Sequence, residues 1–323
     1  MCTAVSYTAS KHYFGRTLDL ECSFGEHTVI TPRRFPFSFR FLPSLSLHHA
    51  IIGIGIVAEN YPLYYDAVNE EGLAMAGLNF PISTIYKAPK KDTKNIAPFE
   101  LIPWVLSQCS SVNEAKTLLC DSALVNVPFN ESWSLSPLHW IIADRNEAIT
   151  IEAVEDGVKV YQNPVGVLTN EPPFYYQLTN LSNYMNVTSA PATNRFSNTV
   201  PLTAYSRGMG ALGLPGDFSS ASRFVRASFV KTNCVFDHTV NDVNQFFHIL
   251  NTVEQPYGCV KLIDDSLEKT VYASCCDTEK GIYYHTTYGC RQIHAVDLRR
   301  ENLEADMLTA YPLVTQENVS FQN

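Results

Sequence analysis

The first residues of the chain carry the groups best suited to covalent chemistry. Cys2 follows the initiator Met1, and a small side chain at that position allows an aminopeptidase to remove the methionine. The cysteine would then hold a thiol and a free α-amine in one residue. An α-amine has a pKa of about 7.7–8.0 and a thiol a pKa of about 8.5, so the amine can take the thiol proton near neutral pH. This pair predicts attack on a carbonyl carbon by a cysteine that serves as its own base.

Two charged residues, Arg16 and Asp19, stand a short distance along the chain. We expect Cys2 to open one strand and residues 14–19 to form the next, so that a hairpin returns both charges to the cysteine. A cation lowers the pKa of a neighbouring thiol, and a carboxylate that accepts hydrogen bonds from an amine fixes its orientation. The alternatives are an ordinary surface ion pair and a frayed N-terminus.

Strands dominate the elements that must position these residues. β-Branched and alternating runs predict strands at 3–7, 27–31, 50–57, 63–68 and 73–80, the last two joined by a turn at 69–72. Helical spacing follows at 98–108 and behind a capping box that begins at Ser111. A three-stranded meander is expected at 139–143, 148–154 and 158–161.

In the second half of the chain, helices are followed by strands. One helix is expected behind the cap Ser219-Ser220 and another over 240–251, and strands are expected at 270–275, 282–287 and 292–298. No internal repeat or long linker interrupts the chain. The order therefore predicts one domain over residues 1–323, of the α+β class, with antiparallel sheets covered by helices.

Composition excludes several classes of protein. The chain has 323 residues, of which 46% are hydrophobic and 17% charged, so it should fold. Its net charge of −9 and lack of basic runs argue against a nucleic-acid partner. The longest apolar run, 50–58, is far shorter than the roughly 20 residues of a membrane-spanning helix. Nine cysteines, an odd number, and no apparent leader predict a cytoplasmic protein without a disulfide scaffold.

Short motifs follow the N-terminal cysteine in a fixed order. They are FGRTLD at 14–19, EGL at 71–73 with GLNFP at 77–81, LTNEP at 168–172 and PGDFSSASRF at 215–224. With Cys2 they resemble the choloylglycine hydrolase family of N-terminal-nucleophile (Ntn) hydrolases, which includes bile salt hydrolases and penicillin V acylases. The resemblance spans nearly the whole chain and implies a four-layer αββα sandwich of two antiparallel sheets between helical layers. We expect no cofactor and no metal.

The resemblance also implies a role for each matching residue at the nucleophile. Cys2 would attack with its own amine as base, after obligatory removal of Met1. Arg16 would lie beside the thiolate and Asp19 would hold the amino group. Thr17 departs from the pattern, since many relatives have Asn there.

Three further matches are implied to complete the catalytic set. Asn79 and Asn170 would stabilise the tetrahedral oxyanion, and Arg223 would complete the polar network. Each has a structural alternative: a satisfied strand end, an Asx turn and a solvated residue in the first turn of a helix, respectively.

The resemblance points to a substrate class as well. Asn79 matches the bile salt hydrolase pattern, whereas penicillin V acylases tend to have Tyr there. The implied reaction cleaves the amide of glycine- or taurine-conjugated bile salts through a thioester, in a homotetramer. A penicillin V acylase, an N-acyl-homoserine lactone acylase and an inactive ligand-binding relative remain alternatives.

Apolar and aromatic residues in three loops would line the steroid site, although core packing is the alternative for each of them. The expected pocket residues are Leu20, Phe24, Tyr61, Leu63, Tyr64, Phe129, Trp133, Leu135 and Leu138.

Overall fold

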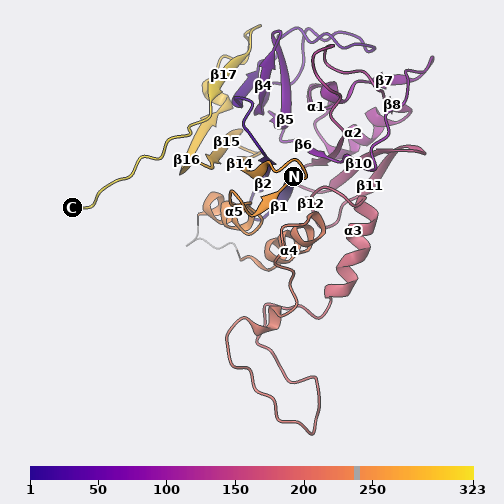
Figure 1. Cartoon of the computed structure of the whole chain (residues 1–323). Coiled ribbons are helices and arrows are strands. Elements are labelled where there is room, and N and C mark those ends of the chain that lie inside the picture. Colours follow the sequence, from indigo (N-terminus) through magenta and orange to yellow (C-terminus); the bar gives the residue numbers. More distant parts are fainter. Residues whose placement is uncertain (236–240) are drawn as a thin grey trace.

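Two antiparallel sheets lie face to face at the centre of the molecule (Figure 1). The structure is a computed structural model that describes residues 1–235 and 241–323. The first sheet has the strand order β12-β1-β2-β14-β15-β16, with β13 beside β14. The second has the order β11-β10-β9-β6-β5-β4-β3-β17, and β7 and β8 form a separate parallel pair.

The strands of the first sheet are β1 (Cys2–Thr8), β2 (His12–Leu20), β12 (Val167–Leu168), β13 (Val260–Lys261), β14 (Leu267–Asp277), β15 (Ile282–Thr287) and β16 (Cys290–Asp297). Those of the second sheet are β3 (His27–Thr31), β4 (Ile51–Ala58), β5 (Tyr61–Asn69), β6 (Ala74–Asn79), β9 (Leu138–Ala143), β10 (Ala148–Val154), β11 (Gly157–Gln162) and β17 (Thr309–Pro312). The small pair consists of β7 (Lys94–Ile96) and β8 (Ser122–Leu124).

The α-helices are α1 (Leu101–Leu106), α2 (Val112–Leu119), α3 (Phe174–Asn180), α4 (Ser220–Asn233) and α5 (Asp242–Asn251). Short 3₁₀ helices are η1 (Pro98–Glu100), η2 (Leu181–Tyr184), η3 (Met209–Ala211) and η4 (Leu298–Arg300).

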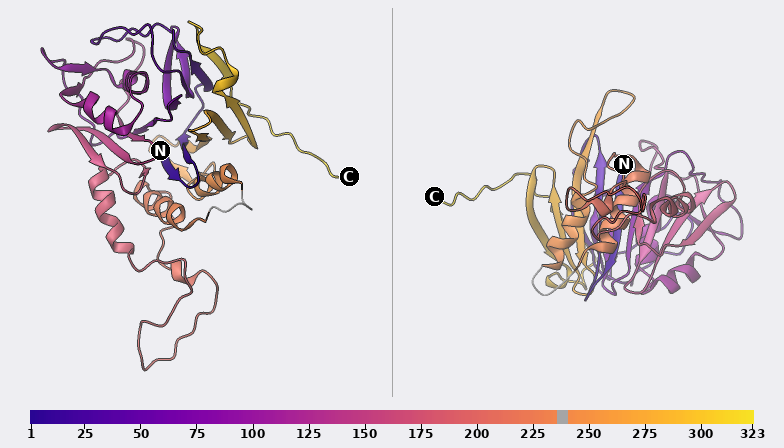
Figure 2. Two further views of the ribbon diagram at one scale, coloured as in Figure 1. Left: turned by 180° about the vertical axis from the view of Figure 1, so that it is seen from behind. Right: turned by 90° about the horizontal axis from the view of Figure 1, so that it is seen from below.

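Helices cover the outer face of each sheet (Figure 2). Helices α4 and α5 pack on β1 and β14 of the first sheet, and α1 packs on β5 and β6 of the second. One apolar core fills the space between the sheets and extends under α4 and α5, while a second joins the second sheet to α1 and α2. The expected four-layer αββα sandwich is thus confirmed.

Strand β2 delivers side chains to both faces of the first sheet, because successive residues of a strand point to opposite sides. Arg16 reaches Tyr65 and Gly77 of the facing sheet, whereas Asp19 points toward α4. A Cβ placed on Gly15 would overlap the carbonyl oxygen of Ser274 on β14. The glycine of the FGRTLD motif therefore permits the close approach of β2 and β14.

Most expected elements are present. The strands at 27–31, 148–154 and 282–287 agree with the structure residue for residue, and the Ser219 hydroxyl caps α4 by accepting a hydrogen bond from the Ser222 amide. The helix expected over 240–251 begins at Asp242, and Val240 lies outside the described residues. The helix expected over 98–108 starts as η1 and ends at Leu106. Helix α3 and the edge strand β17 were not predicted from the sequence.

Between η2 and α4 the chain leaves the body as a long arm (Figures 1 and 2). Large apolar side chains on and beside this arm are exposed, among them Met185, Phe196, Tyr205 and Leu212. Among the described residues, none of the helices combines the length and the apolar character needed to cross a bilayer.

Candidate active site

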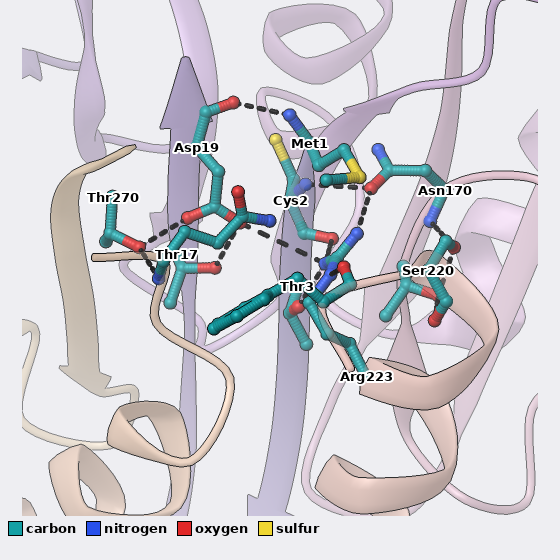
Figure 3. Close-up of polar contacts among 12 residues, drawn as sticks. Met1, Cys2, Thr3, Thr17, Asp19, Asn170, Ser220, Arg223 and Thr270 are labelled. Carbon is teal, nitrogen blue, oxygen red and sulfur yellow. Dashed lines mark hydrogen bonds and ion pairs between the residues drawn. The ribbon is translucent and has the colours of Figure 1, made fainter. Parts of the chain in front are cut away.

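Cys2 lies at the start of β1, between the edge strand β12 and β2 of the first sheet, and is almost fully buried. Pairing of β1 with β2 sets Cys2 opposite Leu18, and pairing with β12 brings the LTNEP motif alongside. The Cys2 amide donates a hydrogen bond of 2.8 Å to Oδ1 of Asn170 (Figure 3). Residues 168 positions apart in the sequence thus meet at the nitrogen that would become the α-amine once Met1 is removed.

Met1 continues β1 along β2. Its carbonyl accepts a hydrogen bond of 2.9 Å from the Asp19 amide, and its amine donates one of 2.6 Å to the Asp19 carbonyl. The same amine forms an ion pair with the buried carboxylate of Glu268. Burial lowers the pKa of this amine from its ordinary value, although the charges of Cys2 and Asp19 oppose the shift. Met1 is therefore held as part of the sheet.

Arg16 is buried between the sheets beside Cys2. Its Nη1 donates to the carbonyls of Gly77 at 2.5 Å and Tyr65 at 3.2 Å. Its Nη2 has no hydrogen-bond partner among the described residues. Burial disfavours the guanidinium charge, yet Cys2, Tyr272 and Asp66 together raise the pKa of Arg16 above its ordinary value. The side chain thus offers the cavity a permanent cation with an unused donor.

Asp19 occupies the opposite face of β2 and is 0% exposed. Its carboxylate accepts hydrogen bonds from the hydroxyls of Thr270 at 2.6 Å and Thr17 at 3.2 Å, and lies 4.0 Å from Nη1 of Arg223. The family resemblance implies that this carboxylate holds the amino group of Cys2. With Met1 attached, the nitrogen of Cys2 instead bonds to Asn170, and Asp19 reaches Met1 through its backbone.

Arg223, from the first turn of α4, joins the helix to the start of β1. Its Nη1 donates to the carbonyl of Cys2 at 2.5 Å and to the hydroxyl of Thr3 at 2.6 Å. Its Nη2 donates to Oδ1 of Asn170 at 2.8 Å, and its Nε to the carbonyl of Phe218 at 3.0 Å. Every nitrogen of the guanidinium thus has an acceptor, and the side chain is completely buried.

The two asparagines differ in their freedom. Nδ2 of Asn170 donates 2.8 Å to the backbone carbonyl of Asn79, and its backbone amide donates to the hydroxyl of Ser220. The side-chain amide of Asn170 is therefore occupied at both ends. The side chain of Asn79 lines the cavity beside Cys2 and has no hydrogen-bond partner among the described residues. It can donate to an oxygen that enters the cavity.

A cavity of about 370 Å³ opens above Cys2. Its wall is largely apolar and includes eight of the nine expected pocket residues: Leu20, Phe24, Leu63, Tyr64, Phe129, Trp133, Leu135 and Leu138. Further lining comes from residues that the sequence analysis did not single out, chiefly Leu18, Ile56, Tyr65 and Phe99. Among the described residues, no group of three His, Cys, Asp or Glu side chains is placed to hold a metal ion.

Tyr61 lies behind this wall instead of lining it. Its ring packs 5.9 Å from Phe99, 6.1 Å from Phe129 and 6.0 Å from Phe37, measured between ring centres. The difference arises because the ring turns into the second core, where it supports two residues that do face the cavity.

A further buried carboxylate, which no motif in the sequence indicates, lies between the sheets. Asp66 accepts hydrogen bonds from the hydroxyls of Tyr272 at 2.5 Å, Ser274 at 2.7 Å and Tyr283. Burial raises the pKa of Asp66, and the charge of Arg16 opposes that shift. Asp66 stands in an ordinary strand pattern, so nothing in its sequence neighbourhood separates it from a half-buried strand residue.

This arrangement defines a class of enzyme. A cysteine at the start of the first strand, beside a buried cation and below an apolar cavity, in an αββα sandwich, is the arrangement of an Ntn hydrolase.

Comparison with known proteins narrows the class. The family model for linear amide C–N hydrolases of the choloylglycine hydrolase family matches residues 2–311. The chain is 52% identical to a bile salt hydrolase/transferase of Lactiplantibacillus plantarum, over 97% of each chain. It is 38% identical to a conjugated bile acid hydrolase of Lactobacillus gasseri, over 96% of this chain and 100% of the other.

Solved structures agree with this. A variant of the conjugated bile acid hydrolase from Clostridium perfringens superposes with a TM-score of 0.94 at 34% identity, covering 100% of both chains. A penicillin V acylase from Agrobacterium tumefaciens shares the fold, with a TM-score of 0.76 at 18% identity over 96% of this chain and 90% of that one. The chain belongs to the choloylglycine hydrolase family of linear amide C–N hydrolases.

Proposed function

We propose that the protein hydrolyses conjugated bile salts, cleaving the amide between the bile acid and glycine or taurine. The observation that carries the proposal is that Cys2 lines an apolar cavity together with Arg16, whose Nη2 has no hydrogen-bond partner among the described residues. A rigid apolar acyl group suits such a wall. The names of the two relatives reported above support the same substrate class.

The mechanism begins once Met1 has been removed. The α-amine of Cys2, held by Oδ1 of Asn170, takes the thiol proton, and the thiolate attacks the amide carbon. Arg16 stabilises the thiolate by its charge, because it is buried where water screens little. The amine then delivers its proton to the leaving nitrogen, and water hydrolyses the resulting thioester.

In this proposal, Asn79 stabilises the oxyanion and Asn170 positions the groups around it. The free side-chain amide of Asn79 donates to the oxyanion, an interaction whose loss typically costs about 10²–10³ in rate. Asn170 is a positioning residue, because its Nδ2 donates to the carbonyl of Asn79 and its Oδ1 accepts from the nitrogen of Cys2. Asp19 and Arg223 hold Cys2 and Asn170 in position, because Arg223 bonds to both of them and forms an ion pair with Asp19.

The test is a competition assay. Processed protein meets glycocholate, taurocholate and penicillin V together, and released glycine, taurine and phenoxyacetate are measured by mass spectrometry. Release of glycine or taurine supports the proposal and gives the preference between them. Release of phenoxyacetate alone would assign the chain to the penicillin V acylases. Cys2→Ala should abolish all release, with Cys22→Ala, an exposed cysteine, as the matched control.

We further propose that the protein acts as a single-domain cytoplasmic homotetramer. Nine free cysteines, three of them exposed, suit a reducing compartment. The arm between η2 and α4, with Phe196 more than four-fifths exposed, supports assembly, because such apolar surface is normally covered by a partner. Light scattering of the intact protein, and of a variant with Phe196→Ser and Tyr205→Ser, tests the assembly.

A further inference from the structure

A second cavity, of about 330 Å³, lies where the chain leaves α5 and meets the first sheet. Its wall is formed by the segment that follows α5 and by β14, β15 and the start of β16. We call it the Gln255 cavity, after the residue that distinguishes it. None of the catalytic residues proposed above lines it.

The side chain of Gln255 is the unusual feature of this cavity. The residue is 1% exposed, and neither its side-chain nitrogen nor its side-chain oxygen has a hydrogen-bond partner among the described residues. More than nine-tenths of buried polar groups in proteins are partnered, so a donor and an acceptor left together without partners call for an explanation.

The backbone around Gln255 shows that the side chain has not been left unpaired by a loose loop. The Gln255 amide donates 2.8 Å to the hydroxyl of Thr270, and the Thr270 amide donates 3.0 Å to the carbonyl of Gln255. The same Thr270 hydroxyl donates to Asp19. The backbone of Gln255 is thus fixed at the wall of the cavity by Thr270, which also bonds to Asp19 of the catalytic network.

Opposite charges complete the wall of the cavity. Nη1 of Arg291 lies 2.7 Å from Oε2 of Glu254, and both residues line the cavity. The Arg291 side chain is about half exposed, so it can turn toward a ligand. A guanidinium is suited to a carboxylate or sulfonate, and a carboxylate to an ammonium group. A ligand that matches this wall carries both charges and can exchange hydrogen bonds with the amide of Gln255.

We propose that the Gln255 cavity binds a small zwitterionic amino acid or aminosulfonate. This is the chemical class of the amine that the proposed hydrolysis releases, and that link alone rests on the proposed function. In the complex, the acidic group of the ligand pairs with Arg291, its ammonium group pairs with Glu254, and the Gln255 amide takes the remaining hydrogen bonds. The cavity is therefore a second site for the amine, separate from the one above Cys2.

The experiment measures binding, so it does not depend on turnover. Glycine and taurine are titrated calorimetrically into the intact protein, with and without saturating cholate to fill the cavity above Cys2. We expect saturable binding of at least one of them that persists with cholate. Gln255→Leu and Arg291→Gln should each weaken it by about tenfold or more. Gln162→Leu, at an exposed glutamine on β11, should leave it unchanged.

Three results would overturn the proposal: no saturable binding to the unmodified protein, binding that cholate abolishes, or equal binding to the unmodified protein and both cavity variants. Arg291→Gln changes only an exposed side chain, so it keeps the test decisive if Gln255→Leu fails to fold. A protein that releases neither glycine nor taurine from conjugates, yet binds one of them here, would refute the proposed function and leave this site standing.

Discussion

Replacing Arg223 by methionine is the most demanding test of how the active site is held together. Methionine keeps much of the length of the side chain and removes the guanidinium. The substitution deletes four hydrogen bonds, to Cys2, Thr3, Asn170 and Phe218, and the ion pair with Asp19.

The expected magnitude follows from burial. Both partners of the ion pair are 0% exposed, so the substitution would leave the Asp19 carboxylate buried with two hydroxyl donors, Thr17 and Thr270, among the described residues. Breaking one side of a buried pair costs about 3–5 kcal/mol, a loss of at least about a hundredfold in the folding equilibrium constant. Arg223→Lys retains the cation but not the planar fork, and should lose about 1.5–3 kcal/mol.

Urea denaturation followed by tryptophan fluorescence measures the free energy of unfolding of both variants. The matched control is Arg226→Met, one turn further along α4. Arg226 is partly exposed and donates to carbonyls of Pro215, Asp217 and Thr252, which water can reach after the substitution, so the expected loss is about 1 kcal/mol. If Arg223→Met is no more destabilising than this control, the account of a buried, ion-paired assembly is wrong.

Three further predictions concern the nucleophile, pH and the sheet. Iodoacetamide should inactivate the processed enzyme by modifying Cys2, and bound bile acid should protect against this. Cys275 should stay unmodified, because burial raises the pKa of its thiol well above the ordinary value. Peptide mass mapping checks both expectations. Burial lowers the pKa of His12 to about 4, so the unfolded chain binds the proton more tightly than the folded protein does. As pH falls from about 6.5 to 4, up to about 3 kcal/mol of the free energy of unfolding should therefore be lost. Denaturation at each pH should show a smaller loss for His12→Gln. Gly15→Ala should destabilise the fold by several kcal/mol, about 3 or more, because the methyl group meets the carbonyl of Ser274; thermal unfolding measures it.

Each of these has a result that would contradict it. Faster modification of Cys275 than of Cys2 would place the reactive thiol elsewhere. An unchanged pH dependence in His12→Gln would show that other groups control the acid transition. A Gly15→Ala protein as stable as the original would mean that β2 and β14 can separate without cost.

Local patterns were enough to predict much of the fold. Alternating apolar residues located the central strands, and a serine before a helical run located the start of α4, because both signals act over a few residues. Helix α3 follows Pro172-Pro173 and buries few residues, and β17 is an edge strand that ends in Pro312, so neither has a strong periodic signal. Their formation depends on contacts with the rest of the molecule.

The candidate site divides in a similar way. The motifs identified the polar residues of the site, but they do not show which atoms form hydrogen bonds with each other. The hydrogen bond from Cys2 to Asn170 and that from Arg223 to Cys2 join positions 168 and 221 residues apart, so only the complete sandwich creates them. Asp66 has no motif at all, and Tyr61 looked like a pocket residue because loop position predicts proximity to a cavity and not the direction of a ring.

The position of Met1 within the sheet restricts when this residue can be removed. An aminopeptidase needs a free, extended end, whereas the folded protein ties the Met1 amine to Glu268 and pairs the following strand on both sides. Under the proposed mechanism, Met1 must therefore be removed before the first sheet closes around its amine. Glu268, which pairs with that amine, is synthesised 267 residues after Met1, so synthesis itself provides the interval. Chains that fold before the aminopeptidase has acted would keep Met1 and would remain inactive, because Cys2 would have no free α-amine.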